Sequence, residues 1–267
     1  MSHMDRVVVC MKQVPASASI GFNPDTNNLD RSNAATMINP ADACALEAAL
    51  ALRDRTGCEV AVITMGRPGA AVLLHEAAEC GATELYLISD PLFAGSDSFA
   101  TATVLAAALK HLGGADLILC GRRAIDGETG QTGPELATFL SLSCLTNVIA
   151  MELPDGTTIR CTRLGDARSE KVEVSLPALF AVCEGMNRLR PPGIAAMRKA
   201  RGLAIEKIDN RVLCIDAGKV GAGGSFTRVR ALYPPAVAGR KRIMERNPEA
   251  GAMEACAIIS KLSGFGR

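Results

Sequence analysis

Apolar residues in the first half of the chain are concentrated in short runs, and longer helix-like stretches separate these runs. The runs contain few polar positions, which is typical of strands buried on both faces. Alternation of such strands with helices predicts βαβ units, a parallel sheet, and strand carboxyl ends that lie along one edge. In chain order the predicted elements are strand 6–11, helix 40–55, strand 58–64, helix 70–80, strand 84–88, helix 97–112 and strand 116–120.

The pattern changes after a helix that we expect to begin near Glu135. Residues 158–163 and 171–174 alternate apolar and polar side chains around a turn at 165–167, which predicts a half-exposed antiparallel hairpin. Residues 176–182 return to an apolar run and predict another buried strand. The expected fold class is therefore α/β, with a mostly parallel, Rossmann-like sheet flanked by helices, a small antiparallel hairpin and an extended C-terminal arm.

Two domains of unequal regularity are expected. Residues 4–204 are predicted to form one nucleotide-binding α/β domain, and residues 205–267 an arm that contacts a partner subunit. Prolines interrupt the arm, and its glycine-rich part at 220–225 argues against regular structure. Within the arm, residues 249–262 predict a helix.

Residues 188–200 contain a Pro-Pro-Gly break followed by a short basic helix. Ile194 and Met197 lie three positions apart and so share one face of this helix, and Arg198 and Lys199 flank them. Two interpretations are open. The helix is either a surface element that covers the domain or a recognition loop that docks a partner protein through its apolar tip.

The strongest chemical signal is the loop that follows the strand at 116–120. Glycines let backbone N–H groups approach an anion, hydroxyls add donors, and a helix N-terminus favours negative charge, so the loop predicts a phosphate site. An ordinary glycine-rich βα loop is the alternative. Segments 10–12, 39–40 and 65–69 are expected at the same edge of the sheet. The candidate residues of the loop are Gly121, Asp126, Gly127, Thr129, Gly130, Gln131, Thr132 and Gly133.

Composition narrows the functional classes. The 29 basic and 28 acidic residues give a net charge of +1, and aromatic residues make up 3% of the chain, so nucleic acid is not an expected partner. No apolar run approaches the roughly 18 residues needed to span a bilayer, so no membrane insertion is expected. The 10 cysteines form no C-x-x-C pair and several lie in apolar runs, which is typical of a reduced, cytoplasmic protein without a metal centre.

Five short motifs, in this order, resemble the β subunit of electron-transfer flavoproteins. The resemblance implies an α/β subunit that pairs with an α subunit carrying a redox-active FAD, and a recognition loop that docks an acyl-CoA dehydrogenase. Conventional β subunits hold AMP, whereas those of the electron-bifurcating branch hold a second FAD that takes a hydride from NADH. The motifs are V-C-M-K-Q-V-P at 9–15, I-N-P at 38–40, G-x-x-A-I-D at 121–126, L-P-A-L-F at 176–180 and M-R-K-A at 197–200.

The loop sequence D-G-E-T-G-Q-T-G-P at 126–134 looks like that of the bifurcating branch. The resemblance therefore favours FAD over AMP, and a subunit that passes electrons between NADH, the α-subunit FAD and an acyl-CoA dehydrogenase. Such a subunit is an electron carrier without catalytic residues of its own, and NADH oxidation belongs to the bifurcating form. A conventional AMP-binding shuttle and a stand-alone adenine-nucleotide-binding module are the alternatives.

The resemblance and the loop pattern together assign the residues. The four named residues of the 194–200 helix are assigned to docking of the dehydrogenase. Arg122, Arg123 and Arg163 are candidates to lie near a flavin, and solvated surface arginines are the alternative. The predicted cofactor-binding residues are Cys10, Lys12, Asn39, Asp42, Met65, Gly66, Gly121, Arg122, Ala124, Asp126, Gly127, Glu128, Thr129, Gly130, Gln131, Thr132 and Gly133.

Overall fold

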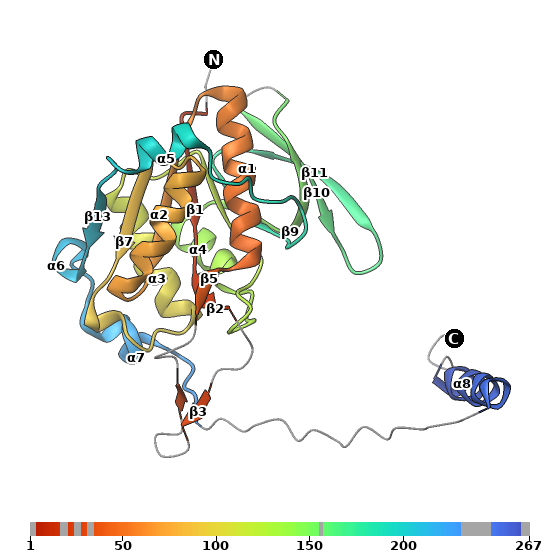
Figure 1. Cartoon of the computed structure of the whole chain (residues 1–267). Helices are drawn as coiled ribbons and strands as arrows, with labels where there is room; N and C mark the ends of the chain where they lie inside the picture. Colours follow the sequence, from red (N-terminus) through yellow and green to blue (C-terminus); the bar gives the residue numbers. More distant parts are fainter. Residues whose placement is uncertain are drawn as a thin grey trace. The chain divides into compact units, whose positions relative to one another are not determined.

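The chain divides into two compact units, Met1–Arg230 and Ala231–Arg267. The first unit holds the sheet and its helices, and the second contains the helix α8 (Pro248–Leu262) (Figure 1). This helix confirms the one predicted at 249–262. The computed structural model describes residues 4–16, 21–23, 28–30, 35–154, 157–230 and 247–262.

The first unit is built on one large sheet. Its strands are β1 (Arg6–Cys10), β6 (Glu59–Met65), β7 (Glu84–Ile88), β8 (Leu117–Gly121), β9 (Ser143–Glu152), β10 (Thr158–Leu164), β11 (Ser169–Ser175), β12 (Ala178–Val182) and β13 (Ile205–Ile208). Their order is β11-β10-β9-β12-β8-β1-β6-β7-β13. Neighbours from β9 through to β13 in this order are parallel, whereas β10 pairs antiparallel with β9 and β11. The predicted α/β class is confirmed, with its mostly parallel sheet and small antiparallel hairpin.

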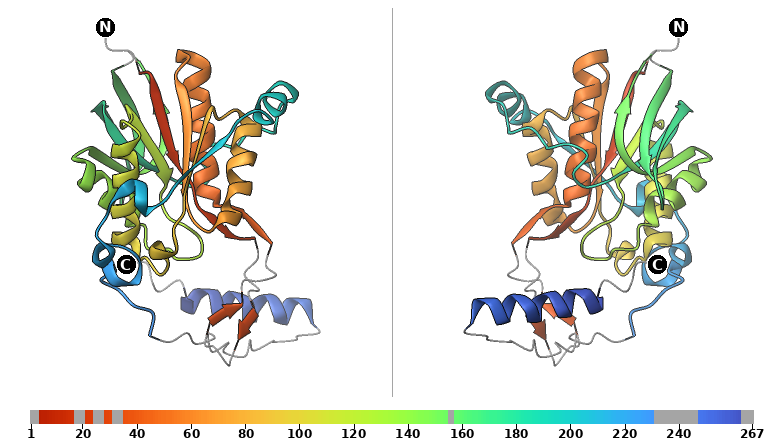
Figure 2. Two further views of the ribbon diagram at one scale, coloured as in Figure 1. Left: turned by 90° about the vertical axis from the view of Figure 1, so that its left-hand side faces the viewer. Right: turned by 90° about the vertical axis from the view of Figure 1, so that its right-hand side faces the viewer.

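Helices cover both faces of this sheet. They are α1 (Pro40–Thr56), α2 (Ala71–Cys80), α3 (Ser98–His111) and α4 (Thr132–Leu140). α1 and α2 lie on one face, and α3 and α4 lie on the other (Figure 2). Successive side chains of a strand point to opposite faces, so Val7 and Val9 join the core beneath α1 while Val8 joins the core beneath α3. Burial on both faces explains why the parallel strands are continuous apolar runs in the sequence.

Smaller elements surround this layered core. Helix α5 (Ile194–Ala200) packs against α2. Two short antiparallel pairs lie between β1 and α1 in the sequence. They are β2 (Gln13–Pro15) with β5 (Thr36–Ile38), and β3 (Gly21–Asn23) with β4 (Asn28–Asp30).

Strands β9 and β13 depart from the sequence-based expectation. β9 was not predicted, because polar residues such as Thr146 and Asn147 interrupt its apolar pattern. β13 begins at Ile205, the first residue of the predicted arm, and pairs with β7. Helices α6 (Asn210–Leu213) and α7 (Gly221–Gly224) follow it within the same compact unit. The α/β unit therefore continues past the predicted boundary.

Local sequence sets the helix ends that border the carboxyl edge of the sheet. Pro40 occupies the first position of α1, where an N–H would have no partner within the helix. α3 begins after Asp97, whose carboxylate accepts the N–H of Ala100 at 3.0 Å. α4 begins at Thr132, earlier than the predicted start near Glu135, so the glycine-rich loop leads directly into a helix N-terminus.

Candidate functional site

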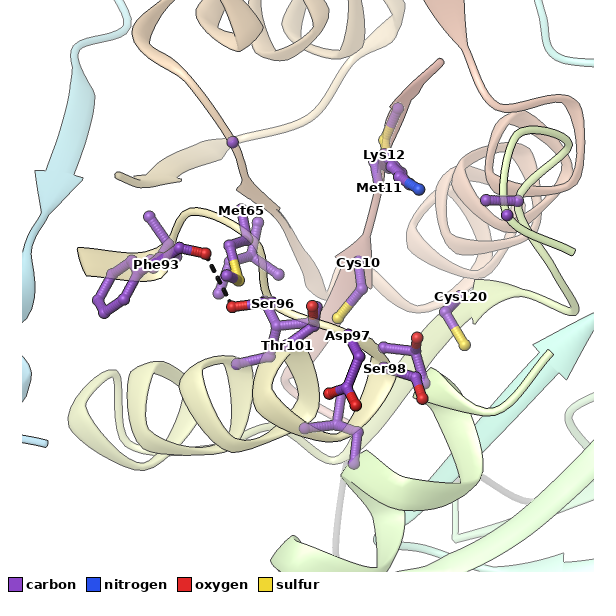
Figure 3. A pocket seen from close by; sticks show the side chains of 18 of the residues that line it. Cys10, Met11, Lys12, Met65, Phe93, Ser96, Asp97, Ser98, Thr101 and Cys120 are labelled. Atoms are coloured by element: carbon purple, nitrogen blue, oxygen red, sulfur yellow. Dashed lines mark hydrogen bonds between the residues drawn. The ribbon is translucent and has the colours of Figure 1, made fainter. Parts of the chain in front are cut away.

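A cavity of about 890 Å³ opens at the carboxyl edge of the parallel strands. The ends of β1, β6, β7 and β8 line it, together with the loop before α4 and the start of α3 (Figure 3). Open α/β sheets bind ligands at this edge. The predicted cofactor-binding residues that line the cavity are Cys10, Lys12, Asp42, Met65, Gly66, Gly121, Arg122, Ala124, Gly127, Glu128, Thr129, Gly130, Thr132 and Gly133.

Asp42 ties two strand ends together at the cavity. Its Oδ2 accepts the backbone N–H of Lys12 and its Oδ1 accepts that of Gly121, both at 2.8 Å. Lys12 follows β1 and Gly121 ends β8, and these strands are neighbours in the sheet. One buried carboxylate therefore fixes the spacing of two chain segments that form the cavity wall. Asp42 lies in the first turn of α1, where the helix dipole also favours a negative charge.

Burial governs the protonation of the acidic groups at this point. Burial raises the pKa of Asp42 to about 6, although the hydrogen bonds from the backbone of Lys12 and Gly121 act in the opposite direction. Burial, with a contribution from the Asp42 charge, raises the pKa of the Cys10 thiol to about 12, and burial raises the pKa of Cys120 as well. The two thiols are therefore protonated at neutral pH and act as wall residues rather than nucleophiles.

Asn39 lies outside the cavity lining and holds the glycine-rich loop through two hydrogen bonds. Its side chain is buried, donates from Nδ2 to the carbonyl of Arg123 at 3.0 Å, and accepts the N–H of Ile125 at 3.2 Å. Asn39 occupies the N-cap position of α1, but its side chain makes no capping hydrogen bond. Its two bonds instead hold the loop against the start of α1.

Asp126 and Gln131 also lie outside the cavity lining. Asp126 Oδ1 accepts a hydrogen bond from Lys12 Nζ at 2.7 Å, so the charge of this lysine is paired. Gln131 Oε1 accepts a hydrogen bond from the hydroxyl of Ser98 at 3.1 Å. The three predicted residues outside the lining thus support the loop and connect it to β1, α1 and α3.

Close packing requires glycine at two positions of the site. A Cβ on Gly121 would overlap Asp42 Oδ1 and lie 2.8 Å from the Cβ of Ala41, and a Cβ on Gly133 would lie 2.9 Å from Cys120 Sγ. Gly130 has a φ of 64°, in the left-handed region that favours glycine. The loop can therefore pass close to the strand ends and leave its backbone open to the cavity.

Three arginines lie among the basic and acidic residues that line the cavity. Arg122 and Arg123, predicted near a flavin, line the cavity, and so does Arg67 of the segment 65–69 that was expected at this edge. Arg163 lies instead in β10, where its Nε donates to Glu170 at 2.7 Å. It is not among the cavity residues, so the structure separates it from the other two candidates.

The cavity has a second wall that the sequence analysis missed. Residues 89–97 connect β7 to α3, and Figure 3 shows Phe93, Ser96 and Asp97 of this segment, with Ser98 at the start of α3, at the cavity. The hydroxyl of Ser96 donates to the carbonyl of Phe93 at 2.8 Å. A polar segment directly after a buried strand, ending in an Asp before a helix, is the signal that would have identified it.

The predicted docking residues lie on α5. Ile194 is 74% exposed and Met197 39% exposed, so both apolar side chains reach solvent in the first unit. Arg198 and Lys199 occupy the last turn of the same helix. The arrangement of two exposed apolar side chains beside two basic ones agrees with the pattern from which docking was predicted.

Two features of the described residues limit the chemistry of the protein. In these parts of the chain, no helix is both long and apolar enough to cross a bilayer. Over the same residues, His, Cys, Asp and Glu side chains form no group of three or more that could hold a metal ion.

The fold and the site define an open α/β protein with a ligand cavity at the carboxyl edge of a parallel sheet. Residues 26–213 match the family model described as the electron transfer flavoprotein domain, and the chain belongs to this family.

Curated relatives match over most of their length. Protein FixA of Bradyrhizobium diazoefficiens is 40% identical over 246 residues, which cover 89% of this chain and 85% of FixA. The caffeyl-CoA reductase-Etf complex subunit CarD of Acetobacterium woodii is 36% identical, covering 89% of this chain and 91% of CarD. The electron transfer flavoprotein subunit beta of Clostridium acetobutylicum is 34% identical, covering 96% and 97%. Membership on the β-subunit side of the family implies electron transfer and an α-subunit partner.

Proposed function

We propose that the chain binds FAD in the cavity and passes electrons between NADH, the FAD of an α subunit and an acyl-CoA dehydrogenase, as in flavin-based electron bifurcation. The observation that carries this proposal is the D-G-E-T-G-Q-T-G-P loop at 126–134, most of whose residues line the cavity. The cavity volume supports a dinucleotide, because about 890 Å³ is near the upper end of the roughly 300–1,000 Å³ of small-molecule sites. AMP requires less space.

The donor set at the cavity fits a pyrophosphate. The start of α4 points toward the loop, and a helix N-terminus with nearby glycines is suited to bind phosphate through backbone N–H groups. Thr129 and Thr132 add hydroxyl donors, and Arg122 and Arg123 offset the phosphate charge. These residues would hold the FAD diphosphate.

The contribution of the chain itself is binding, orientation and exclusion of water. When bound, FAD supplies the hydride-accepting and single-electron chemistry. Asp42 holds the ends of β1 and β8 at a fixed spacing, and the protonated thiols of Cys10 and Cys120 form part of the wall between them. The arginines place positive charge at the cavity, which favours a reduced, anionic flavin.

The first test measures the nucleotide content of the purified αβ complex by acid extraction and chromatography. Two FAD and no AMP per heterodimer are expected, and NADH should then reduce the flavin. One FAD and one AMP would contradict the FAD assignment and make the chain a conventional shuttle subunit. A β site that retains neither nucleotide would contradict both.

A second test concerns the proposed partner. CarD is named as a subunit of a caffeyl-CoA reductase complex, which supports an acyl-CoA dehydrogenase-type partner for this chain. Ile194→Glu should slow electron transfer to the dehydrogenase at least tenfold at unchanged flavin content, because it places a charge on an exposed docking residue. Val212→Glu is the matched control, since Val212 is an exposed apolar residue on α6. Equal transfer rates for Ile194→Glu and the wild type would remove the docking assignment.

A further inference from the structure

A later segment of the chain holds the second wall of the cavity from outside. We call residues 221–227 the strap. The N–H of Ala222 donates to the carbonyl of Ala94 at 3.0 Å, and the hydroxyl of Ser225 lies 3.1 Å from the carbonyl oxygen of Gly95. Ala94 and Gly95 line the cavity, so the strap is bonded to the backbone that forms its wall.

Asp97 is the junction between the strap and the cavity. Its backbone N–H donates to Ser225 Oγ at 2.8 Å, and its Oδ2 accepts both the N–H and the hydroxyl of Thr227, at 2.9 and 3.0 Å. Its Oδ1 accepts the N–H of Ala100 at the start of α3. One side chain therefore lines the cavity, caps α3 and holds the strap.

The strap also approaches the wall more closely than most residues would allow. Gly221 has a φ of 58°, and a Cβ there would overlap the carbonyl oxygen of Leu92 and lie 2.9 Å from that of Ala94. The ring of Phe226 packs edge-to-face against Phe99 in the first turn of α3, with centroids 4.6 Å apart. Hydrogen bonds, a close backbone approach and a ring contact thus join the two segments.

We propose that the strap positions the second wall of the nucleotide cavity through Asp97, so that strap docking and nucleotide binding stabilise each other. The inference rests on the proposed nucleotide-binding function. Residues 89–97 lie between β7 and α3, outside both the sheet and α3, and a 3₁₀ turn at Pro91–Phe93 is regular structure within them, so contacts of Ala94, Gly95 and Asp97 to the strap help to set their position. If the wall is formed only while the strap is docked, the apparent dissociation constant rises as the docked fraction falls.

The test changes the strap and leaves the cavity lining intact. Ser225 and Thr227 do not line the cavity, so Ser225→Ala combined with Thr227→Val removes the side-chain hydrogen bonds of the strap to Gly95 and Asp97 without touching a ligand contact. In the full-length αβ complex, stripped of nucleotide, this double variant should bind AMP, ADP and FAD at least about fivefold more weakly than the wild type. Thr227→Ser, which keeps the hydroxyl, should restore most of the affinity in the Ser225→Ala background. Thr138→Val is the control, because its hydroxyl bonds the carbonyl of Pro134 within α4 and neither residue lines the cavity.

Hydrogen exchange supplies the reciprocal readout. Nucleotide should slow exchange of the amides of Ala222 and Thr227, because both donate to the wall. Equal affinities for wild type and double variant, or strap exchange that nucleotide does not change, would overturn the inference alone. Failure of the wild type to bind any of the three nucleotides would overturn the proposed function and, with it, the inference.

Discussion

The parallel part of the sheet and the β10–β11 hairpin differ in how far their polar side chains are buried. In the parallel part, helices cover both faces and the functional side chains lie at the strand ends, where Asp42 is buried with both carboxylate oxygens bonded. In the β10–β11 hairpin, polar side chains alternate along the strands, and Arg160 and Arg163 pair with Glu173 and Glu170 at the surface.

This difference separates residues whose replacement is costly from residues whose replacement is tolerated. At the carboxyl edge, Asp42 and Asn39 are buried and have fixed partners, so the loss of either leaves other groups without their hydrogen bonds. In the hairpin, water replaces a lost partner, and exposed ion pairs contribute little.

The largest effect is expected for Gly121→Ala. The added methyl group would overlap the carboxylate of Asp42 and displace the ends of β1 and β8. Overpacking together with a disturbed buried acceptor should lower the free energy of unfolding by about 4 kcal/mol and abolish nucleotide retention. Urea denaturation and nucleotide extraction measure the two effects. Gly127→Ala is the matched control from the same loop, because its Cβ would meet no atom within 4 Å and its stability should equal that of the wild type. Equal losses for the two variants would remove the packing argument.

The second effect is a pH dependence that Asp42 imposes. Its pKa is about 6 in the folded protein and about 3.9 in an unfolded chain, so the folded state binds more protons between these values. Its contribution to stability is therefore complete below pH 4 and falls by about 3 kcal/mol as the pH rises through 6. Denaturation at several pH values should show that this fall is absent in Asp42→Asn.

Asp54 provides the control with the opposite sign. Burial alone would raise the pKa of Asp54, but hydrogen bonds from Arg190 and Arg53 outweigh it and hold the pKa below its usual value. Its contribution is lost as the pH falls, so Asp54→Asn should reduce stability at neutral pH more than at low pH. If Asp42→Asn left the pH dependence of the free energy of unfolding unchanged, that dependence could not be assigned to Asp42.

The parallel part of the sheet could be predicted from the sequence because burial on both faces leaves an unmistakable apolar run. Strand β9 could not be predicted in this way. It joins the parallel part of the sheet to the hairpin, and polar residues such as Thr146 and Asn147 interrupt its apolar pattern. β13 could not, because its strand character depends on pairing with β7, more than a hundred residues earlier in the chain. Local propensity carries no information on such pairing.

The site shows the same limit. The loop at 121–133 and the segments after β1 and β6 could be placed together, because parallel strands end at one edge. The contacts of Asn39 could not be predicted from the sequence. An N-cap position predicts a hydrogen bond to the residue's own helix, but the Asn39 side chain bonds the backbone of Arg123 and Ile125 instead. The position of the strap could not be predicted either, because Thr227 bonds Asp97, which lies 130 residues earlier in the chain.

A smaller effect is expected for Arg190, which fixes the segment before α5. Its guanidinium bonds both carboxylate oxygens of Glu47 and also Asp54 on α1, and these bonds raise its pKa further above the usual range. Arg190→Ala should lower the free energy of unfolding by about 1–2 kcal/mol and slow transfer to the dehydrogenase, because the docking helix loses its anchor. Arg190→Lys keeps the charge but not the forked geometry and should recover less than half of the loss. Full recovery by lysine would show that charge, not geometry, holds the segment.

The smallest effect is expected in the hairpin, and it decides whether the comparison holds. Arg160 donates to Glu173 through Nε at 2.9 Å and Nη2 at 2.6 Å, yet both side chains are about half exposed. Water and salt compete for these groups, so Arg160→Ala should leave the urea midpoint within experimental error, and added salt should remove any residual difference. Nucleotide affinity should also stay unchanged, because β10 and β11 contribute no residue to the cavity. A loss of nucleotide binding in Arg160→Ala would mean that the hairpin and the carboxyl edge act as one unit. Burial alone would then not decide which polar side chains can be replaced without cost.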